Sequence, residues 1–235
     1  MNLENFLLKL EDSILFILKS FPSLLKGSIV AIEITILSIF IGMIIGILIA
    51  FLHIYGSKTI KKIVYFYEWI LRGSPILVIL FFLYFGIPHI PIIGVNLNPF
   101  FAVVLGLGLA SSAYQAQIYR GAILSIGAHQ MEAGLSIGLT KFETLIYIII
   151  PQAVRLSLPG FTNEFTIVLK DSPLAYAVGI SEILKNGRDI IVKTARPFEI
   201  YFAAAILYFI LFQLFYNLFK FISKKFEVPG FLISQ

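Results

Sequence analysis

The chain contains no cysteine, and only 13% of its 235 residues are charged. The absence of cysteine excludes disulfides, thiolate zinc sites and cysteine-ligated iron–sulfur clusters. A soluble domain carries about 25% charged residues, whereas 59% of the residues here are hydrophobic. The composition therefore predicts an all-α membrane protein with several transmembrane helices.

The sequence also lacks a nucleotide-binding motif and a recognisable catalytic or metal-binding cluster, which limits the activities that the chain could have. The sequence has no GxxxxGK[ST] phosphate-binding loop, so we expect any ATP to be used by a partner subunit. Its three histidines, His53, His89 and His129, are isolated from one another, and no nucleophile–base pair or metal-ligand cluster is recognisable. We therefore expect no enzyme, no cofactor and no metal site. The net charge of +5 could suggest a nucleic-acid partner, but the basic residues mostly flank apolar runs and indicate topology instead.

The first 27 residues differ from the rest in pattern. Between residues 3 and 21, apolar side chains recur at helical spacing with charged ones between them, and Pro22 follows. This pattern predicts an amphipathic helix in the membrane surface, and we assign residues 1–27 to it. The segment lacks the basic start and small-residue cleavage site of a signal peptide.

A transmembrane domain is predicted over residues 28–222, followed by a cytoplasmic tail at 223–235. Its five expected spans are 28–54, 65–87, 99–120, 145–169 and 200–219. The second and third form a helical hairpin, because prolines and asparagines interrupt the uncharged stretch between them. Gly42 and Gly46 form a GxxxG pattern that favours close helix packing in the first span.

Basic residues predict the orientation of these spans. Three lysines lie between the first two spans, at 58, 61 and 62, and three more follow the last span, at 220, 224 and 225. Both segments are expected in the cytoplasm, with the N-terminus outside. The segments left outside, 1–27, 88–98 and 171–199, each have a formal charge of zero. The segment between the third and fourth spans then lies inside.

That inner segment, residues 128–151, is the most informative part of the chain. Glu132, Ala133 and Gly134 are followed by Gly138 and later by Pro151. The two glycines are four residues apart, which would clear one helical face and let another backbone approach. The alternative is an ordinary interfacial helix that its glycines only loosen.

This spacing resembles the EAA loop of ATP-binding-cassette importer permeases. Gly134 and Ile150 stand where that pattern has alanine and leucine. Residues 72–88, 112–121, 151–159 and 163–182 are similar to the polar amino-acid uptake permeases of that class. The resemblance covers about residues 28–222. It implies a coupling helix that docks on a separate ATPase, in the plasma membrane of a prokaryote. The implied partners are two ATPase subunits, a second permease chain and an extracytoplasmic amino-acid-binding protein.

Charged and polar residues within the fourth span are candidates for a substrate pathway. Glu164 and Asp171 are seven residues apart, so they share a face if the helix extends that far, and Asn163 is adjacent. Pro159 and Gly160 are expected to break the helix below them. Alternatively, Asp171 ends the helix and pairs with Lys170. The two carboxylates would suit a cationic amino acid, but Lys170 or Arg155 could equally hold them.

The second and third spans supply four further candidates. Tyr114 and Gln117 face one side of the third helix and are candidate pathway residues, or they bond a neighbouring helix. The family pattern often has glutamate at the position of Gln117. Arg72 and Arg120 are expected at the cytoplasmic ends of the second and third spans, where they would anchor the helices as positive-inside residues. Alternatively, they bind the permease partner or acidic loop residues such as Glu132.

An importer permease has one rival of another class, an ATP-independent secondary transporter or channel. Such folds often contain duplicated halves, and this sequence shows no internal repeat. The sequence therefore predicts a membrane permease with its nucleotide-hydrolysing partner on a separate chain.

Overall fold

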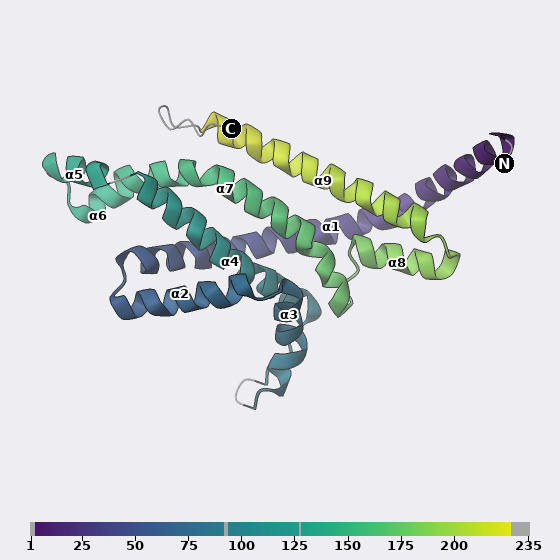
Figure 1. Cartoon of the computed structure of the whole chain (residues 1–235), viewed down its shortest axis with the longest axis horizontal. Helices are drawn as coiled ribbons and strands as arrows, with labels where there is room; N and C mark the ends of the chain where they lie inside the picture. The colour runs from purple at the N-terminus through teal and green to yellow at the C-terminus, as the bar shows by residue number, and fades with distance from the viewer. Residues whose placement is uncertain (1–2, 92–93, 127, 227–235) are drawn as a thin grey trace.

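The computed structural model describes residues 3–91, 94–126 and 128–226, and in these ranges the chain is helical without a strand. Four long helices run along the length of the molecule, with α5 and α6 at one end and α8 near the other (Figure 1). The elements are α1 (Leu3–Tyr55), α2 (Lys58–Gly73), α3 (Ile76–Phe81), η1 (Phe82–Gly86), η2 (Ile87–His89), α4 (Pro99–Ser125), α5 (Ala128–Ser136), α6 (Lys141–Thr144), η3 (Leu145–Ile149), α7 (Ile150–Asp171), η4 (Ser172–Val178), α8 (Ile183–Thr194) and α9 (Pro197–Lys225).

Membrane-length apolar helices account for most of this architecture. Four are long and apolar enough to cross a bilayer: Leu7–Tyr55, Pro99–Ser125, Lys141–Val178 and Pro197–Lys225. A fifth crossing is possible only if α2 and the segment 76–89 count as one bent span. The predicted all-α membrane class is confirmed. The first, third, fourth and fifth predicted spans each lie within one of these helices.

Helix α1 is longer than any predicted element. It runs for 53 residues and includes Pro22, so the predicted N-terminal amphipathic helix is not separate from the first span. At 1.5 Å per residue α1 is about 80 Å long, whereas the hydrocarbon core of a bilayer is about 30 Å thick. Residues 3–27 therefore form one continuous helix with the first span. Their position in the membrane surface stays a prediction.

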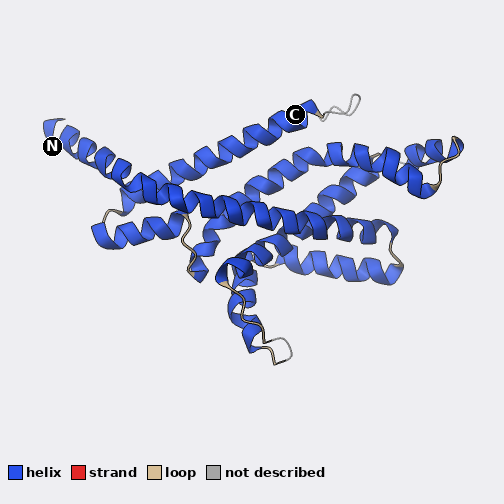
Figure 2. Ribbon diagram, turned by 180° about the vertical axis from the view of Figure 1, so that it is seen from behind, coloured by secondary structure: helices blue, strands red, loops and turns tan. Residues whose placement is uncertain are grey.

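The second predicted span, 65–87, is wrong as a single helix. Its first half belongs to α2, and the chain then turns by 104° before the segment 76–89 (Figure 2). The cause is Pro75, because a proline keeps the preceding residue out of the helical region. Ser74 accordingly has φ −94° and ψ 137°.

The predicted break at Pro159 and Gly160 is also absent, since α7 continues through both residues to Asp171. Gly160 instead allows close packing, because a Cβ atom on it would lie 2.8 Å from Cγ2 of Ile118 on α4. A proline within a membrane helix is tolerated where neighbouring groups re-satisfy the backbone. Helix α7 therefore packs against α4 as one continuous element.

Close packing of α1 on α4 forms the centre of the bundle. A Cβ atom on Gly46 would lie 3.0 Å from the carbonyl oxygen of Ser112, and one on Gly108 would lie 3.1 Å from that of Ser38. A Cβ on Gly42 would lie 2.5 Å from the amide nitrogen of Gln115. These small residues let the two backbones approach, as the GxxxG pattern predicted.

Helix α8 is fixed to the bundle by a buried carboxylate. Glu182 is fully buried, caps α8 by accepting the amide hydrogen of Lys185, and also accepts a hydrogen bond from the Tyr208 hydroxyl on α9. Burial raises the pKa of Glu182, although these hydrogen bonds lower it in part. The predicted outer segment 171–199 is therefore a folded part of the bundle.

Candidate functional site

The inner segment folds into two short helices joined by a sharp turn. Helix α5 ends at Ser136, and Gly138 follows with φ +89°. The amide of Leu139 donates to the carbonyl of Gly134, and that of Gly138 donates to Leu135. This is the Schellman arrangement, in which a left-handed glycine ends a helix. Helix α6 then starts with a capping box between Thr140 and Glu143.

The two glycines of this segment have different roles, so the expectation that they clear one helical face is wrong. Gly138 lies outside the helix in the left-handed turn, and a Cβ atom there would meet none of the described residues beyond its two chain neighbours within 4 Å. Gly134 lies against α6, where a Cβ would be 2.4 Å from Cγ2 of Thr144. The close approach is therefore internal, between α5 and α6, and it fixes the angle between these two helices. We call α5, α6 and the turn between them the elbow.

An exposed apolar surface covers the outside of this elbow. The side chains of Ile137 and Phe142 are 75% and 72% exposed, and Ala133 and Glu132 beside them are exposed as well. Pro151 lies in the first turn of α7, behind the elbow. Sequence reasoning missed Ile137 in the turn and Phe142 in α6, although both lie between the motif residues Gly134 and Pro151. An exposed apolar patch with a polar rim is typical of a protein-binding surface.

Glu164 lies in a polar network between α4 and α7. Its side chain is 4% exposed and accepts a hydrogen bond of 2.7 Å from the Ser111 hydroxyl. The amide of Gln115 donates to the same hydroxyl oxygen at 3.0 Å and to the carbonyl of Ile39 at 3.2 Å. The Tyr119 hydroxyl donates to Oε1 of Gln115. Sequence reasoning did not select Ser111 and Gln115, because single small polar residues are common in membrane helices.

The other candidates on α7 are arranged differently from the expectations. Helix α7 extends to Asp171, so the condition under which Asp171 shares a face with Glu164 is met. Asp171 is also the last residue of the helix, as the alternative held, but it forms no ion pair with Lys170, whose ammonium lies 5.5 Å from the ring centroid of Phe212. Neither Lys170 nor Arg155 pairs with Glu164 among the described residues. Asn163 is exposed. Glu164 is thus buried, whereas Asn163 and Lys170 on the same helix are exposed.

A charged cavity of about 450 Å³ lies where α1, α2 and α4 meet. Its lining residues are His53, Tyr65, Glu68, Trp69, Arg72, Gly73, Gln117 and Arg120. Glu68 is 3% exposed; it accepts a hydrogen bond from the Gln117 amide and lies 3.4 Å from Nδ1 of His53. The structure thus brings together three sequence candidates, Arg72, Gln117 and Arg120, with a buried carboxylate that the sequence did not distinguish.

Both arginines of this cavity lie near the C-terminal ends of helices: Arg72 is in the last turn of α2, and Arg120 comes shortly before the end of α4 at Ser125. Their role as anchors at cytoplasmic span ends stays a prediction. The Arg72 guanidinium is 5.2 Å from the ring centroid of Tyr114 on α4. Arg120 donates to Oε1 of Gln117 at 3.4 Å. Glu132, proposed as its partner, lies instead 3.6 Å from His129. Tyr114 and Gln117 both face α2 through these contacts.

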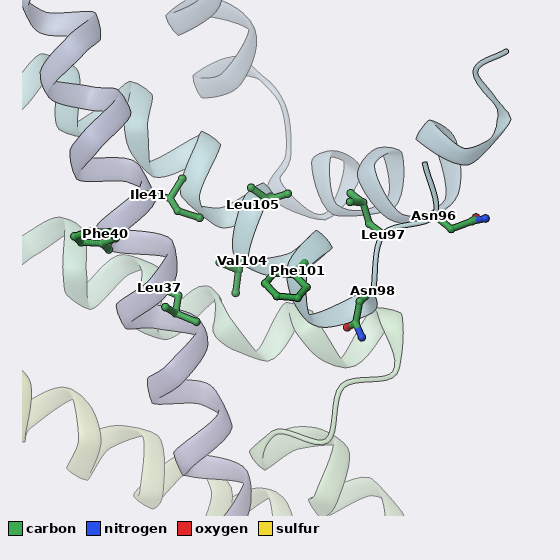
Figure 3. A pocket seen from close by; sticks show the side chains of 9 residues that line it. All are labelled: Leu37, Phe40, Ile41, Asn96, Leu97, Asn98, Phe101, Val104 and Leu105. Carbon is green, nitrogen blue, oxygen red and sulfur yellow. The ribbon is translucent and has the colours of Figure 1, made fainter. Parts of the chain in front are cut away.

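A second cavity of about 500 Å³ lies between α1 and α4 on another side of the molecule. Apolar side chains from both helices line it, including Phe40 and Phe101 (Figure 3). Its polar residues are Asn96 and Asn98, and the latter is used to cap α4. It therefore offers no charge to a polar solute.

Comparisons with known proteins agree with this geometry. Residues 38–228 match the family described as "Binding-protein-dependent transport system inner membrane component". The chain is 32% identical over 192 residues to the glutamine transport system permease protein GlnP of Escherichia coli (strain K12), covering 82% of this chain and 87% of that protein. It is 30% identical over 199 residues to the nopaline transport system permease protein NocM of Agrobacterium fabrum, covering 82% and 83%.

Two solved structures share the fold. An amino acid ABC transporter crystallised with histidines superposes with a TM-score of 0.82 at 33% identity, covering 90% of this chain and 97% of that one. The methionine ABC transporter MetNI, in an inward-facing conformation, has a TM-score of 0.74 at 18% identity, covering 88% and 97%. The second likeness concerns the fold alone.

Proposed function

We propose that this chain, which belongs to the family of inner membrane components of binding-protein-dependent transport systems, is the permease subunit of an ATP-driven importer of polar amino acids. Relatives that cover most of the chain are named for glutamine and nopaline transport. A solved relative is an amino acid ABC transporter. These likenesses support an amino acid as the substrate.

The observation that carries the proposal is the α5–α6 elbow. It presents Ile137 and Phe142 to the outside, next to the motif residues Glu132 and Ala133. We infer that this surface docks on a separate ATPase, which hydrolyses ATP while this chain needs no cofactor of its own. Because the elbow continues directly into α7, movement of the docked ATPase would move α7 against α4. Access would then change from outside to inside.

The proposed assembly contains two such permease chains, identical or related, with two ATPase subunits and an extracytoplasmic amino-acid-binding protein. One chain has few spans with which to enclose a path, so we place the path between two permease chains. The elbow and the lysines near 58 and 220 lie on the cytoplasmic side in this arrangement, with the N-terminus outside. The protein would therefore lie in the plasma membrane of a prokaryote.

Reconstitution tests the proposed function. Vesicles containing the permease, its ATPase and its binding protein are expected to accumulate radiolabelled L-glutamine or L-arginine only when ATP is supplied on the ATPase side. Uptake should stop without ATP even when ion gradients are kept. Uptake that continues on a gradient alone would favour the secondary transporter or channel and would overturn the proposal.

A cationic preference is the finer part of the proposal, and it depends on Glu164 and Asp171. Because Ser111 binds Glu164 and neighbouring helices enclose it in this conformation, a role in the path requires α4 and α7 to separate during transport. Asn163, exposed on the same helix, would then line the path with Tyr114 and Gln117.

The variant Glu164→Gln tests the role of this carboxylate. It keeps an acceptor for Ser111 but removes the negative charge. If Glu164 attracts a cationic side chain, we expect arginine uptake to fall about tenfold relative to glutamine uptake, corresponding to about 1.4 kcal/mol. The measurement is competitive uptake of the two labelled amino acids. An unchanged ratio and rate would make Glu164 a structural residue.

A further inference from the structure

The charged cavity between α1, α2 and α4 has more positive than negative groups. Arg72 and Arg120 line it together with one carboxylate, that of Glu68. Within the part of the chain that the structure describes, no carboxylate oxygen lies within 4.0 Å of either guanidinium. Arg72 contacts the Tyr114 ring and Arg120 contacts the Gln117 amide, so both guanidinium groups keep further donors.

Helix α4, which borders the cavity, is long and apolar enough to cross a membrane. Tyr114, beneath Arg72, is near the middle of the 27-residue helix α4. Ionisable groups at membrane depth are expensive, and they usually face a water-filled cavity or a partner charge. Two arginines beside a cavity and without a carboxylate partner therefore indicate a site for an anionic group. The guanidinium fork binds a carboxylate with two parallel hydrogen bonds.

The same cavity also holds an acceptor for a cation. Glu68 is almost fully buried, and its two described contacts, with Gln117 and His53, leave acceptor positions on its oxygens. A carboxylate and two guanidinium groups thus border one space of about 450 Å³. That volume lies within the range of about 300–1,000 Å³ that is usual for small-molecule sites.

We propose that this cavity binds the zwitterionic group that all α-amino acids share. Arg72 and Arg120 receive the α-carboxylate, and Glu68 receives the α-ammonium. The inference rests on the proposed function, because it assumes an amino-acid substrate. It adds a site for the common part of the substrate, which is separate from Glu164 and Asp171 and indifferent to the side chain carried.

Equilibrium binding to the purified permease–ATPase complex, without the binding protein, tests the site. The probes are radiolabelled L-arginine and L-glutamine, and the competitor is agmatine, which is arginine without its α-carboxylate. We expect both amino acids to bind and agmatine to compete at least about tenfold less well than arginine. Arg120→Gln should raise the Kd for both amino acids about tenfold. The matched control is Arg155→Gln, an exposed arginine of α7 outside the cavity, which should bind as the wild type does.

A second set of variants tests the carboxylate. Glu68 and Gln117 are hydrogen-bonded neighbours on α2 and α4, so exchanging them keeps the charge within the cavity. Glu68→Gln alone should weaken binding about tenfold, and the double variant Glu68→Gln with Gln117→Glu should recover most of it. Recovery also shows that the fold is intact. An exchange variant that elutes as the intact complex but binds no better than Glu68→Gln would overturn the role of Glu68.

The outcomes separate this inference from the proposed function. If the wild type shows no ATP-dependent uptake, the proposed function fails. If it transports amino acids but Arg120→Gln binds and transports as well as the wild type, or agmatine competes as well as arginine, only the inference about the cavity fails. Wild-type uptake without detectable binding at millimolar amino acid would likewise overturn only this inference.

Discussion

Replacing Gly138 with valine is expected to abolish uptake while leaving ATP hydrolysis by the complex. At φ +89° a β-branched side chain is strained by about 1–3 kcal/mol, because this region of backbone conformation suits glycine. The turn would relax, and the angle between α5 and α6 would change. The docked ATPase would then no longer move α7 in step with its own closure. Uptake and hydrolysis are measured together in vesicles.

A second substitution distinguishes this cause from a steric clash with the ATPase. Asparagine is bulky but tolerates the left-handed conformation, and beyond the two adjacent residues no described atom lies within 4 Å of a Cβ at position 138. Gly138→Asn should therefore retain most coupled uptake. If the asparagine and valine variants lose uptake equally, position 138 is a contact surface. If both transport normally, the elbow does not couple to the ATPase.

Replacing Gly46 with isoleucine is expected to have the largest effect on folding. A Cβ atom there would already lie 3.0 Å from the carbonyl oxygen of Ser112 and 3.2 Å from the amide nitrogen of Ala116. Both are backbone atoms of α4, so no side-chain rotation relieves the contact. The helices must separate along their closest line of packing, which we expect to cost more than about 3 kcal/mol.

The measurement is the yield and thermal stability of detergent-solubilised protein, monitored by size-exclusion chromatography and by fluorescence of Trp69, the single tryptophan. Gly121 provides the control: it lies on α4, the helix that Gly46 of α1 packs against, and a Cβ atom there meets no described residue within 4 Å. Gly121→Ala should leave stability unchanged or raise it by up to about 1 kcal/mol. Normal yield of Gly46→Ile would show that the α1–α4 contact is not essential.

Long apolar helices were the most predictable part of this fold. The third and fifth spans lie within α4 and α9, because uninterrupted apolar runs of about 20 residues have few alternatives in a bilayer. The glycine pattern at 42 and 46 also predicted where helices pack closely, since only small residues allow it. These features depend on local composition, which a single sequence contains.

Features that depend on which segments become neighbours were not predictable. Glu68 is surrounded by apolar and aromatic residues in the sequence, and only the return of α2 along α1 places it beside His53 and Gln117. The role of Gly134 was misjudged for the same reason, because its neighbour Thr144 comes close only after the turn at Gly138. A break was predicted at Pro159, yet α7 continues through it, as α1 does through Pro22.

The continuous helix α1 connects two distant parts of the molecule. Near its beginning, Asp12 and Ser13 are tied to Arg196 and Glu199 at the start of α9, and toward its other end His53 adjoins the charged cavity. Both points lie on one continuous helix of 53 residues, so a movement at one of them is transmitted along α1 to the other. A tilt of α1 beside the cavity would therefore also move the start of α9, to which the beginning of α1 is bonded.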